Sequence, residues 1–102
     1  MAPSQEGKNI KKVTDEELIF RFQGGEIEAY NEIVARYKDR LTNYIYRYVG
    51  NFDECDDIVQ DTFVKVYVSK HLYKEIAKFS TWIYTIAINL AKTKVVKQQK
   101  YK

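Results

Sequence analysis

Apolar residues recur at alternating spacings of three and four along the stretch from Glu26 to Val49. The recurring residues are Ile27, Tyr30, Val34, Tyr37, Leu41, Tyr44 and Tyr48. This heptad-like spacing gathers apolar side chains into one stripe, so it predicts a long helix that packs nearly parallel to its neighbours and ends at Gly50. No stretch of useful length alternates with the period of a strand. The predicted fold class is therefore all-α.

Capping signals predict one helix before this long helix and one after it. Thr14 stands three residues before Glu17, which is a capping-box pattern, and the apolar run that follows stops at Gly24. Asp53 is the predicted cap of a third helix that fades around Ser69, because its carboxylate can accept hydrogen bonds from the first free N–H groups.

The remaining chain predicts a loop and a fourth helix. Residues 69–78 break the apolar period, and Ser80 is the predicted cap of a helix that runs toward a lysine-rich end. Phe79 is placed to pack against Tyr84 one turn later, as in a hydrophobic staple. The expected architecture is a compact four-helix domain.

The length of 102 residues suits one domain with a modest core. Residues 1–13 are polar and lack an apolar period, so we expect a flexible arm there. The helical domain is expected over 14–97, followed by a basic tail over 98–102.

Charge is divided unevenly along the chain. Residues 1–13 carry three Lys and one Glu, residues 14–61 carry five basic and twelve acidic residues, and residues 62–102 carry nine Lys and one Glu. Blocks of opposite charge usually face different partners. We therefore expect a protein partner on the acidic part and nucleic acid on the basic part.

The third helix has an acidic outer side. Helical periodicity places Cys55, Ile58, Val59, Thr62, Phe63 and Val66 inward, and Asp57, Gln60, Asp61, Val64 and Val68 outward. One interpretation is that the acidic residues are simply solvated side chains on an exposed surface. The other is that they attract a basic partner, which then contacts the apolar surface formed by the two valines.

The last helix is apolar nearly all round. The predicted inward residues are Phe79, Trp82, Ile83, Ile86 and Leu90, while Tyr84, Ile88 and Val95 lie on the reverse with Thr85 and Lys92. Either this helix is buried on both sides, or its outer face binds a flat apolar ligand such as DNA bases.

Aromatic residues alternate with lysines around the start of this helix. The rings are Tyr73, Phe79, Trp82 and Tyr84, and the cations are Lys70, Lys74 and Lys78. Rings can stack on bases while cations follow phosphates, so the combination favours single-stranded nucleic acid. The alternative is that Phe79 and Trp82 belong to the core.

The sequence argues against an enzyme. It has one Cys, one His, no Gly-rich phosphate loop and no metal-ligand spacing, so we expect no metal and no cofactor. His71 lies among lysines and is interpreted as a surface or nucleic-acid-contacting residue. The single Cys55, with no apolar signal or membrane segment, favours the cytoplasm.

Two sequence motifs follow one another along the chain. They are CDDIVQDTF, from Cys55 to Phe63, and FSTWIYTIAINLA, from Phe79 to Ala91. In this order the chain resembles region 2 of the bacterial extracytoplasmic-function (ECF) sigma factors of the sigma-70 family, over roughly residues 14–97. The resemblance implies an initiation-factor domain that binds core RNA polymerase, recognises the minus-ten promoter element and helps to hold the melted strand. It implies neither a cofactor nor a chemical step.

The resemblance also implies roles for particular residues. Asp57, Gln60 and Asp61 match the motif that contacts the clamp helices of the beta-prime subunit, and Val64 is added from its helical face. The loop from Lys70 to Lys78, with His71, Tyr73 and Lys74, corresponds to the segment that captures a flipped base. The helix from Phe79 to Lys92, which includes Trp82, corresponds to the one that lines the melted strand, and Asn89 matches a family Asn. Tyr84, Thr85, Ile88 and Lys92 are added from their expected exposure on this helix.

Two further expectations concern the whole protein. Family members carry a second, helix-turn-helix domain that reads the minus-thirty-five element, so we expect the native protein to be longer than this chain. An anti-sigma partner is common in the family, and nothing in the sequence identifies one. The alternative outside this family is a helical adaptor that binds protein only, which would show no salt-dependent binding to promoter DNA.

Overall fold

The computed structural model describes residues 9–100, with side chains described as far as residue 97. Its elements are η1 (Ile10–Lys12), α2 (Asp15–Gln23), α3 (Ile27–Val49), α4 (Phe52–Val68), η2 (Lys70–Leu72) and α5 (Phe79–Lys100). The described residues contain four α-helices and no strand, so the predicted all-α four-helix architecture is confirmed. None of the described helices is both long enough and apolar enough to span a membrane.

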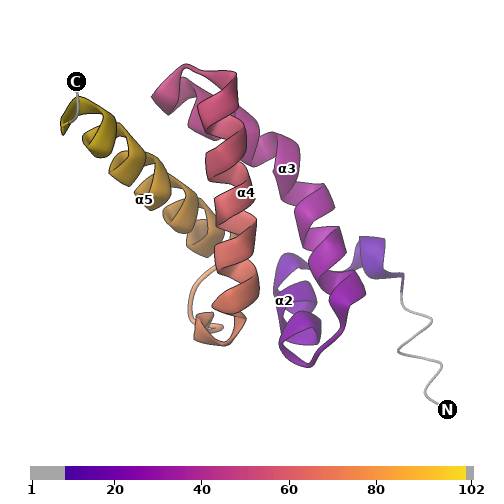
Figure 1. Ribbon diagram of the computed structural model, residues 1–102. Helices are drawn as coiled ribbons and strands as arrows, with labels where there is room; N and C mark the ends of the chain where they lie inside the picture. The colour runs from indigo at the N-terminus through magenta and orange to yellow at the C-terminus, as the bar shows by residue number, and fades with distance from the viewer. Residues whose placement is uncertain (1–8, 101–102) are drawn as a thin grey trace, which may run out of the picture.

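The three long helices pack against one another, and α2 lies against the N-terminal half of α3 (Figure 1). Helix α4 contacts both α3 and α5, which also contact each other. The short η2 turn lies between the end of α4 and the end of α2. The segment from η2 to the start of α5 therefore runs past α2, far from the turn that joins α3 to α4 (Figure 1).

Two of the predicted helix ends are confirmed. The Thr14 hydroxyl accepts a hydrogen bond from the Glu17 backbone N–H at 3.0 Å, which caps α2. Gly50 ends α3 in the left-handed conformation, with φ of 69°, and its N–H donates to the Tyr46 carbonyl. A residue with a Cβ adopts that conformation only at a cost, which explains why a glycine ends the helix.

Two predicted caps are wrong. Helix α4 is capped by Asn51, whose side chain accepts from the Glu54 N–H at 3.0 Å, and Asp53 lies inside the first turn. Helix α5 begins at Phe79, one residue before the predicted cap Ser80. The Phe79 N–H donates instead to the Glu16 carboxylate of α2 at 2.8 Å. This cap comes from 63 residues away in the sequence, so no local pattern could indicate it.

The arm expected over residues 1–13 is folded where the structure describes it. The Asn9 side chain accepts from the Lys11 N–H and begins the η1 turn, and Val13 is buried in the core. The Arg36 guanidinium of α3 donates to the Ile10 carbonyl at 3.2 Å. Residues 1–8 of the arm, and residues 101–102 of the basic tail, lie outside the described residues.

The buried stripe of α3 differs from the predicted heptad. Its buried residues are spaced four apart throughout: Ala29, Ile33, Tyr37, Leu41 and Ile45. Ile27, Tyr44 and Tyr48, which the heptad placed in the stripe, are exposed. Rows of residues four apart are inclined by about 26° to the helix axis, so α3 crosses its neighbours instead of running nearly parallel to them.

Candidate functional site

The two sides of α4 are as the sequence predicted. All six residues placed inward are buried: Cys55, Ile58, Val59, Thr62, Phe63 and Val66. The outward residues Asp57, Gln60, Asp61, Val64 and Val68 are all exposed and share one side of the helix. We call the stripe formed by Asp57, Gln60, Asp61 and Val64 the α4 face.

Among the described residues, the contacts found for side chains of the α4 face are local or weak. The Gln60 amide donates to the Asp56 carboxylate one turn earlier, at 2.9 Å. The Lys94 ammonium of α5 lies 3.5 Å from the Asp57 carboxylate; the Asp57 side chain is exposed and that of Lys94 is partly exposed. Exposed ion pairs contribute little to stability, so the face can exchange these contacts for those of a partner at low cost.

Helix α5 packs against both α3 and α4, which decides between the alternatives left open by its sequence. Its fully buried residues are Phe79, Ile83, Ala87 and Ala91. Three of the residues predicted to point inward, Trp82, Ile86 and Leu90, are only partly buried. The two alanines were missed because their small side chains carry little apolar signal, although they allow neighbouring helices to approach closely.

The apolar residues on the reverse of α5 face a neighbouring helix and not the solvent. The Tyr84 ring contacts Tyr37 and Tyr44 of α3, with ring centroids 6.0 and 4.9 Å apart. Ile88, one turn further on, is also partly buried against the core. The expected apolar outer face for DNA bases is therefore corrected to a covered one. The exposed side of α5 is polar, with Thr81, Thr85, Asn89 and Lys92.

Two of the predicted base-contacting rings are core residues. Tyr73 is 3% exposed and Phe79 is fully buried. They form a triangle with Trp82, in which the ring centroids are 5.4 to 5.8 Å apart. Burial leaves neither Tyr73 nor Phe79 a free face on which a base could stack, so their predicted direct contact with DNA is corrected to support of Trp82, which is partly exposed.

The basic residues of the loop are also of two kinds, those exposed to solvent and one engaged within the protein. Lys74, Lys78 and His71 are exposed, as a contact with phosphates requires. The Lys70 ammonium instead lies over the Phe22 ring, 4.3 Å from its centroid, which is a cation–π geometry. Lys70 is therefore already engaged within the protein.

The same segment exposes two large apolar side chains that sequence reasoning passed over. Leu72 is 69% and Ile76 is 95% exposed. Their signal in the sequence was the presence of apolar residues in a stretch without helical period, where no core face can account for them. Isolated exposed apolar residues are common, but here they flank the exposed lysines.

An open hollow of about 480 Å³ lies between the start of α2, the loop and the start of α5. It is lined by Asp15, Glu16, Glu75, Ile76, Ala77, Lys78 and Ser80. Three carboxylates and one ammonium therefore surround it. No sequence pattern predicted this hollow, because its lining comes from segments about sixty residues apart.

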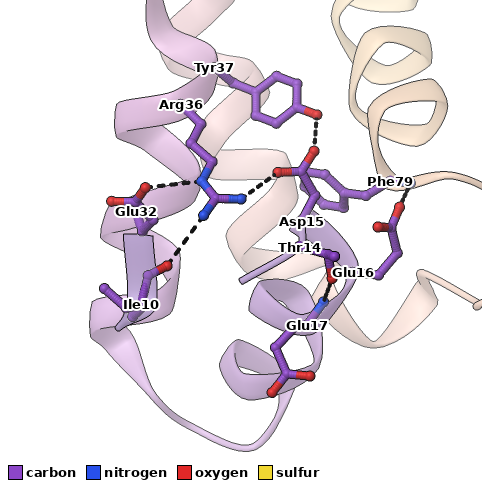
Figure 2. A network of polar contacts seen from close by, with 9 residues as sticks. All are labelled: Ile10, Thr14, Asp15, Glu16, Glu17, Glu32, Arg36, Tyr37 and Phe79. Carbon is purple, nitrogen blue, oxygen red and sulfur yellow. Dashed lines mark hydrogen bonds and ion pairs between the residues drawn. The ribbon is translucent and has the colours of Figure 1, made fainter. Parts of the chain in front are cut away.

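Beside the hollow lies a polar network that joins α2 to α3 and α5 (Figure 2). The Asp15 carboxylate accepts from the Tyr37 hydroxyl at 2.5 Å and from the Arg36 guanidinium at 2.9 Å. Burial, followed by the hydrogen bond to Asp15, raises the pKa of Tyr37 well above its usual value of 10, so Tyr37 remains a neutral donor. Hydrogen bonds to Glu32 and Asp15 outweigh burial and raise the pKa of Arg36. The network fixes the first turn of α2.

Comparison with known proteins agrees with this geometry. Residues 33–101 match the sigma-70 region 2 family. Over 88 residues the chain is 36% identical to the ECF RNA polymerase sigma-E factors of Haemophilus influenzae and Escherichia coli K12, a match that covers 86% of this chain and 46% of each relative. The chain thus spans about half the length of the curated relatives it matches.

A solved structure has the same fold. The NMR structure of an engineered region 2 of sigmaE in complex with GTAAAA superposes with a TM-score of 0.79 at 37% sequence identity. The match covers 88% of this chain and 94% of that chain. The family match, the curated relatives and the solved structure all confirm the resemblance indicated by the two motifs. The chain belongs to the sigma-70 region 2 family.

Proposed function

We propose that this chain is the part of a bacterial transcription initiation factor that binds core RNA polymerase and holds the melted minus-ten promoter strand. The observation that carries the proposal is the solved relative, which shares the fold over 88% of this chain and was determined in complex with GTAAAA. The factor itself supplies no chemical step, and it works in the cytoplasm beside the polymerase.

In this proposal the strand lies along the loop and the polar side of α5. Lys74 and Lys78 approach the phosphates, and the exposed part of Trp82 offers an apolar surface to a base. Asn89 and Lys92 extend the same side of α5 toward its C-terminal half. His71 and Thr85 are exposed and take part as weaker polar contacts, whereas Tyr84 and Ile88 support the helix from beneath.

The polymerase contact is assigned to the α4 face, toward the clamp helices of the beta-prime subunit. Its acidic residues favour a basic partner, and Val64, which is 58% exposed, supplies an apolar centre. The α4 face lies on α4, whereas the strand site lies on the loop and α5, so the two partners contact different residues and both can be bound at the same time. An anti-sigma protein would cover both surfaces.

The test is direct binding of a labelled GTAAAA oligonucleotide, measured by fluorescence anisotropy at several salt concentrations. We expect affinity to fall with increasing salt, and Trp82→Ala to weaken binding by about 1–3 kcal/mol because a stacking surface is lost. Lys78→Ala should weaken it by less, and should reduce the salt dependence by about one phosphate contact.

The matched control is Lys65→Ala, which removes the same charge from an exposed position of α4. If Lys65→Ala weakens binding as much as Lys78→Ala, the binding reflects net charge and not the proposed strand site. If the wild-type chain shows no salt-dependent binding to GTAAAA or to other minus-ten sequences, DNA binding is excluded and a protein-only adaptor is favoured.

A further inference from the structure

We propose that helix α2 sets the position of the loop over residues 70–78 by holding it at both ends, with Gln23 and Glu16 as the positioning residues. The inference rests on the proposed function, because this loop is the segment assigned to the melted strand. It concerns a helix that lies entirely before the part of the chain matching the family model, which begins at residue 33.

The first end of the loop is held by the last residue of α2. The Gln23 amide donates to the Lys70 carbonyl at 2.7 Å and approaches the Tyr73 carbonyl at 3.4 Å. Next to it, the Lys70 ammonium lies 4.3 Å from the centroid of the Phe22 ring. The η2 turn is thus joined to α2 by a side-chain hydrogen bond and a cation–π contact.

The second end is held by the first turn of α2. The Glu16 carboxylate accepts the Phe79 N–H at 2.8 Å, where α5 begins. A hydrogen bond to a charged acceptor is stronger than one between neutral groups, and a negative charge at this position also complements the positive end of the helix dipole. Glu16 therefore fixes the point where the loop ends.

Between these ends the loop is supported by one buried side chain, Tyr73, whose ring packs against Phe79 and Trp82. Within it, the Tyr73 hydroxyl donates to the Ala77 carbonyl, and the Ala77 N–H approaches the Lys74 carbonyl at 3.3 Å. The side chains of Glu75, Ile76 and Lys78 are exposed. Residues 74–78 have exposed side chains, and a segment with few buried contacts opens easily, so its position depends on Tyr73 and on the two ends of the loop.

Helix α2 is itself rigidly placed, which it must be to position another segment. Its first turn is held to α3 by the bonds of Asp15 to Arg36 and Tyr37 (Figure 2). Its last turn is held by a bidentate pair between Arg21 and Glu26, with N–O distances of 3.0 and 2.8 Å. The distance between Glu16 and Gln23 is then set by the helix, and with it the span of the loop.

The consequence for binding is preorganisation. A loop already held in its bound position loses less conformational freedom when a strand binds, which increases affinity without any new contact. If the ends are released, only a fraction of molecules presents the competent loop, and the apparent affinity falls by that fraction. Gln23 and Glu16 therefore act on the strand through the loop.

The experiment compares Gln23→Ala, Glu16→Ala and Glu16→Gln with Glu17→Ala in the whole chain. Glu17 lies in the same turn of α2 and carries the same charge as Glu16, so Glu17→Ala controls for the loss of a negative charge near DNA. Glu16→Gln keeps a side-chain oxygen that can accept the Phe79 N–H, so it is the variant expected to rescue.

Two properties are measured on each variant. The first is the rate of limited tryptic cleavage after Lys74 and Lys78 in the native protein, which reports loop opening without reference to DNA. The second is the dissociation constant for GTAAAA. We expect Gln23→Ala and Glu16→Ala to raise cleavage and weaken binding, each by roughly three- to tenfold relative to Glu17→Ala, as expected from one lost hydrogen bond.

Glu16→Gln should restore most of the wild-type resistance to tryptic cleavage and most of the wild-type affinity for GTAAAA. Unchanged cleavage in Gln23→Ala and Glu16→Ala would overturn the positioning role of α2. Increased cleavage with unchanged affinity would show that loop position does not matter for the strand, which also overturns the proposal. If the wild-type chain does not bind the oligonucleotide, the proposed function fails, and the cleavage rates alone decide whether α2 holds the loop.

Discussion

The α4 face and the loop region between α2 and α5 are built in opposite ways. The α4 face comes from one helix, and its residues Asp57 to Val64 are neighbours through helical periodicity alone. The loop region combines the two ends of α2, the loop itself and the start of α5, joined by hydrogen bonds between residues 47 to 63 positions apart. Substitutions on the α4 face should therefore change binding without changing stability, whereas substitutions in the loop region should change both.

The largest expected effect is that of Phe79→Ala, which tests whether the loop region depends on the core. The ring is fully buried against Tyr37, Tyr73 and Trp82. Its removal leaves a cavity and should lower the free energy of unfolding by about 3–5 kcal/mol. Urea denaturation followed by circular dichroism measures this loss.

Val64→Ala is the matched substitution on the α4 face and should change the free energy of unfolding by no more than about 0.5 kcal/mol. A loss below about 1 kcal/mol for Phe79→Ala would mean that the ring is not part of the core, and the contrast between the two regions would not hold.

The next effect concerns the α4 face, where Asp61→Lys should weaken binding to core polymerase by about 2 kcal/mol, or roughly thirtyfold. The reversal of charge opposes a basic partner, and the exposed side chain leaves the fold unaffected. Pull-down of core polymerase together with a thermal melt measures both quantities.

Asp39→Lys makes the same change of charge at an exposed position of α3 and should leave binding nearly unchanged. Equal retention of polymerase by the wild-type chain and Asp61→Lys would remove the assignment of the α4 face.

The smallest effect is that of Tyr37→Phe, which removes one bond from the network that holds α2. At neutral pH it should cost about 1 kcal/mol, because Asp15 keeps its bond to Arg36. The pKa of Tyr37 is higher in the folded protein than its usual value of 10. The stability that the neutral Tyr37 hydroxyl provides is therefore complete below pH 10, and it is lost as the pH rises above 10.

Urea titrations between pH 7 and pH 11 measure the free energy of unfolding. At the alkaline end it should fall more steeply with pH for the wild type than for Tyr37→Phe. Burial also raises the pKa values of Tyr30 and Tyr73. Tyr37→Phe should therefore still lose some stability as the pH rises. Identical slopes would show that Tyr37 does not contribute to the alkaline loss.

The elements of this fold were predictable because each signal for them is local. Thr14 before Glu17 and Gly50 after α3 mark helix ends through bonds to near neighbours. The inner side of α4 follows from a period of 3.6 residues in one continuous apolar pattern. The heptad of α3 failed because tyrosine satisfies an apolar pattern whether it is buried, as Tyr37 is, or exposed, as Tyr48 is.

What the sequence determined by itself is the set of four helices, the acidic α4 face and membership of the family, because helical period, capping and motif spacing act over a few residues. Only the tertiary structure decided that Tyr73 and Phe79 are core, that Lys70 lies over Phe22, and that Glu16 caps α5. The physical reason is that burial and long-range hydrogen bonds depend on which helices pack together. No pattern within α2 or α5 alone carries that information.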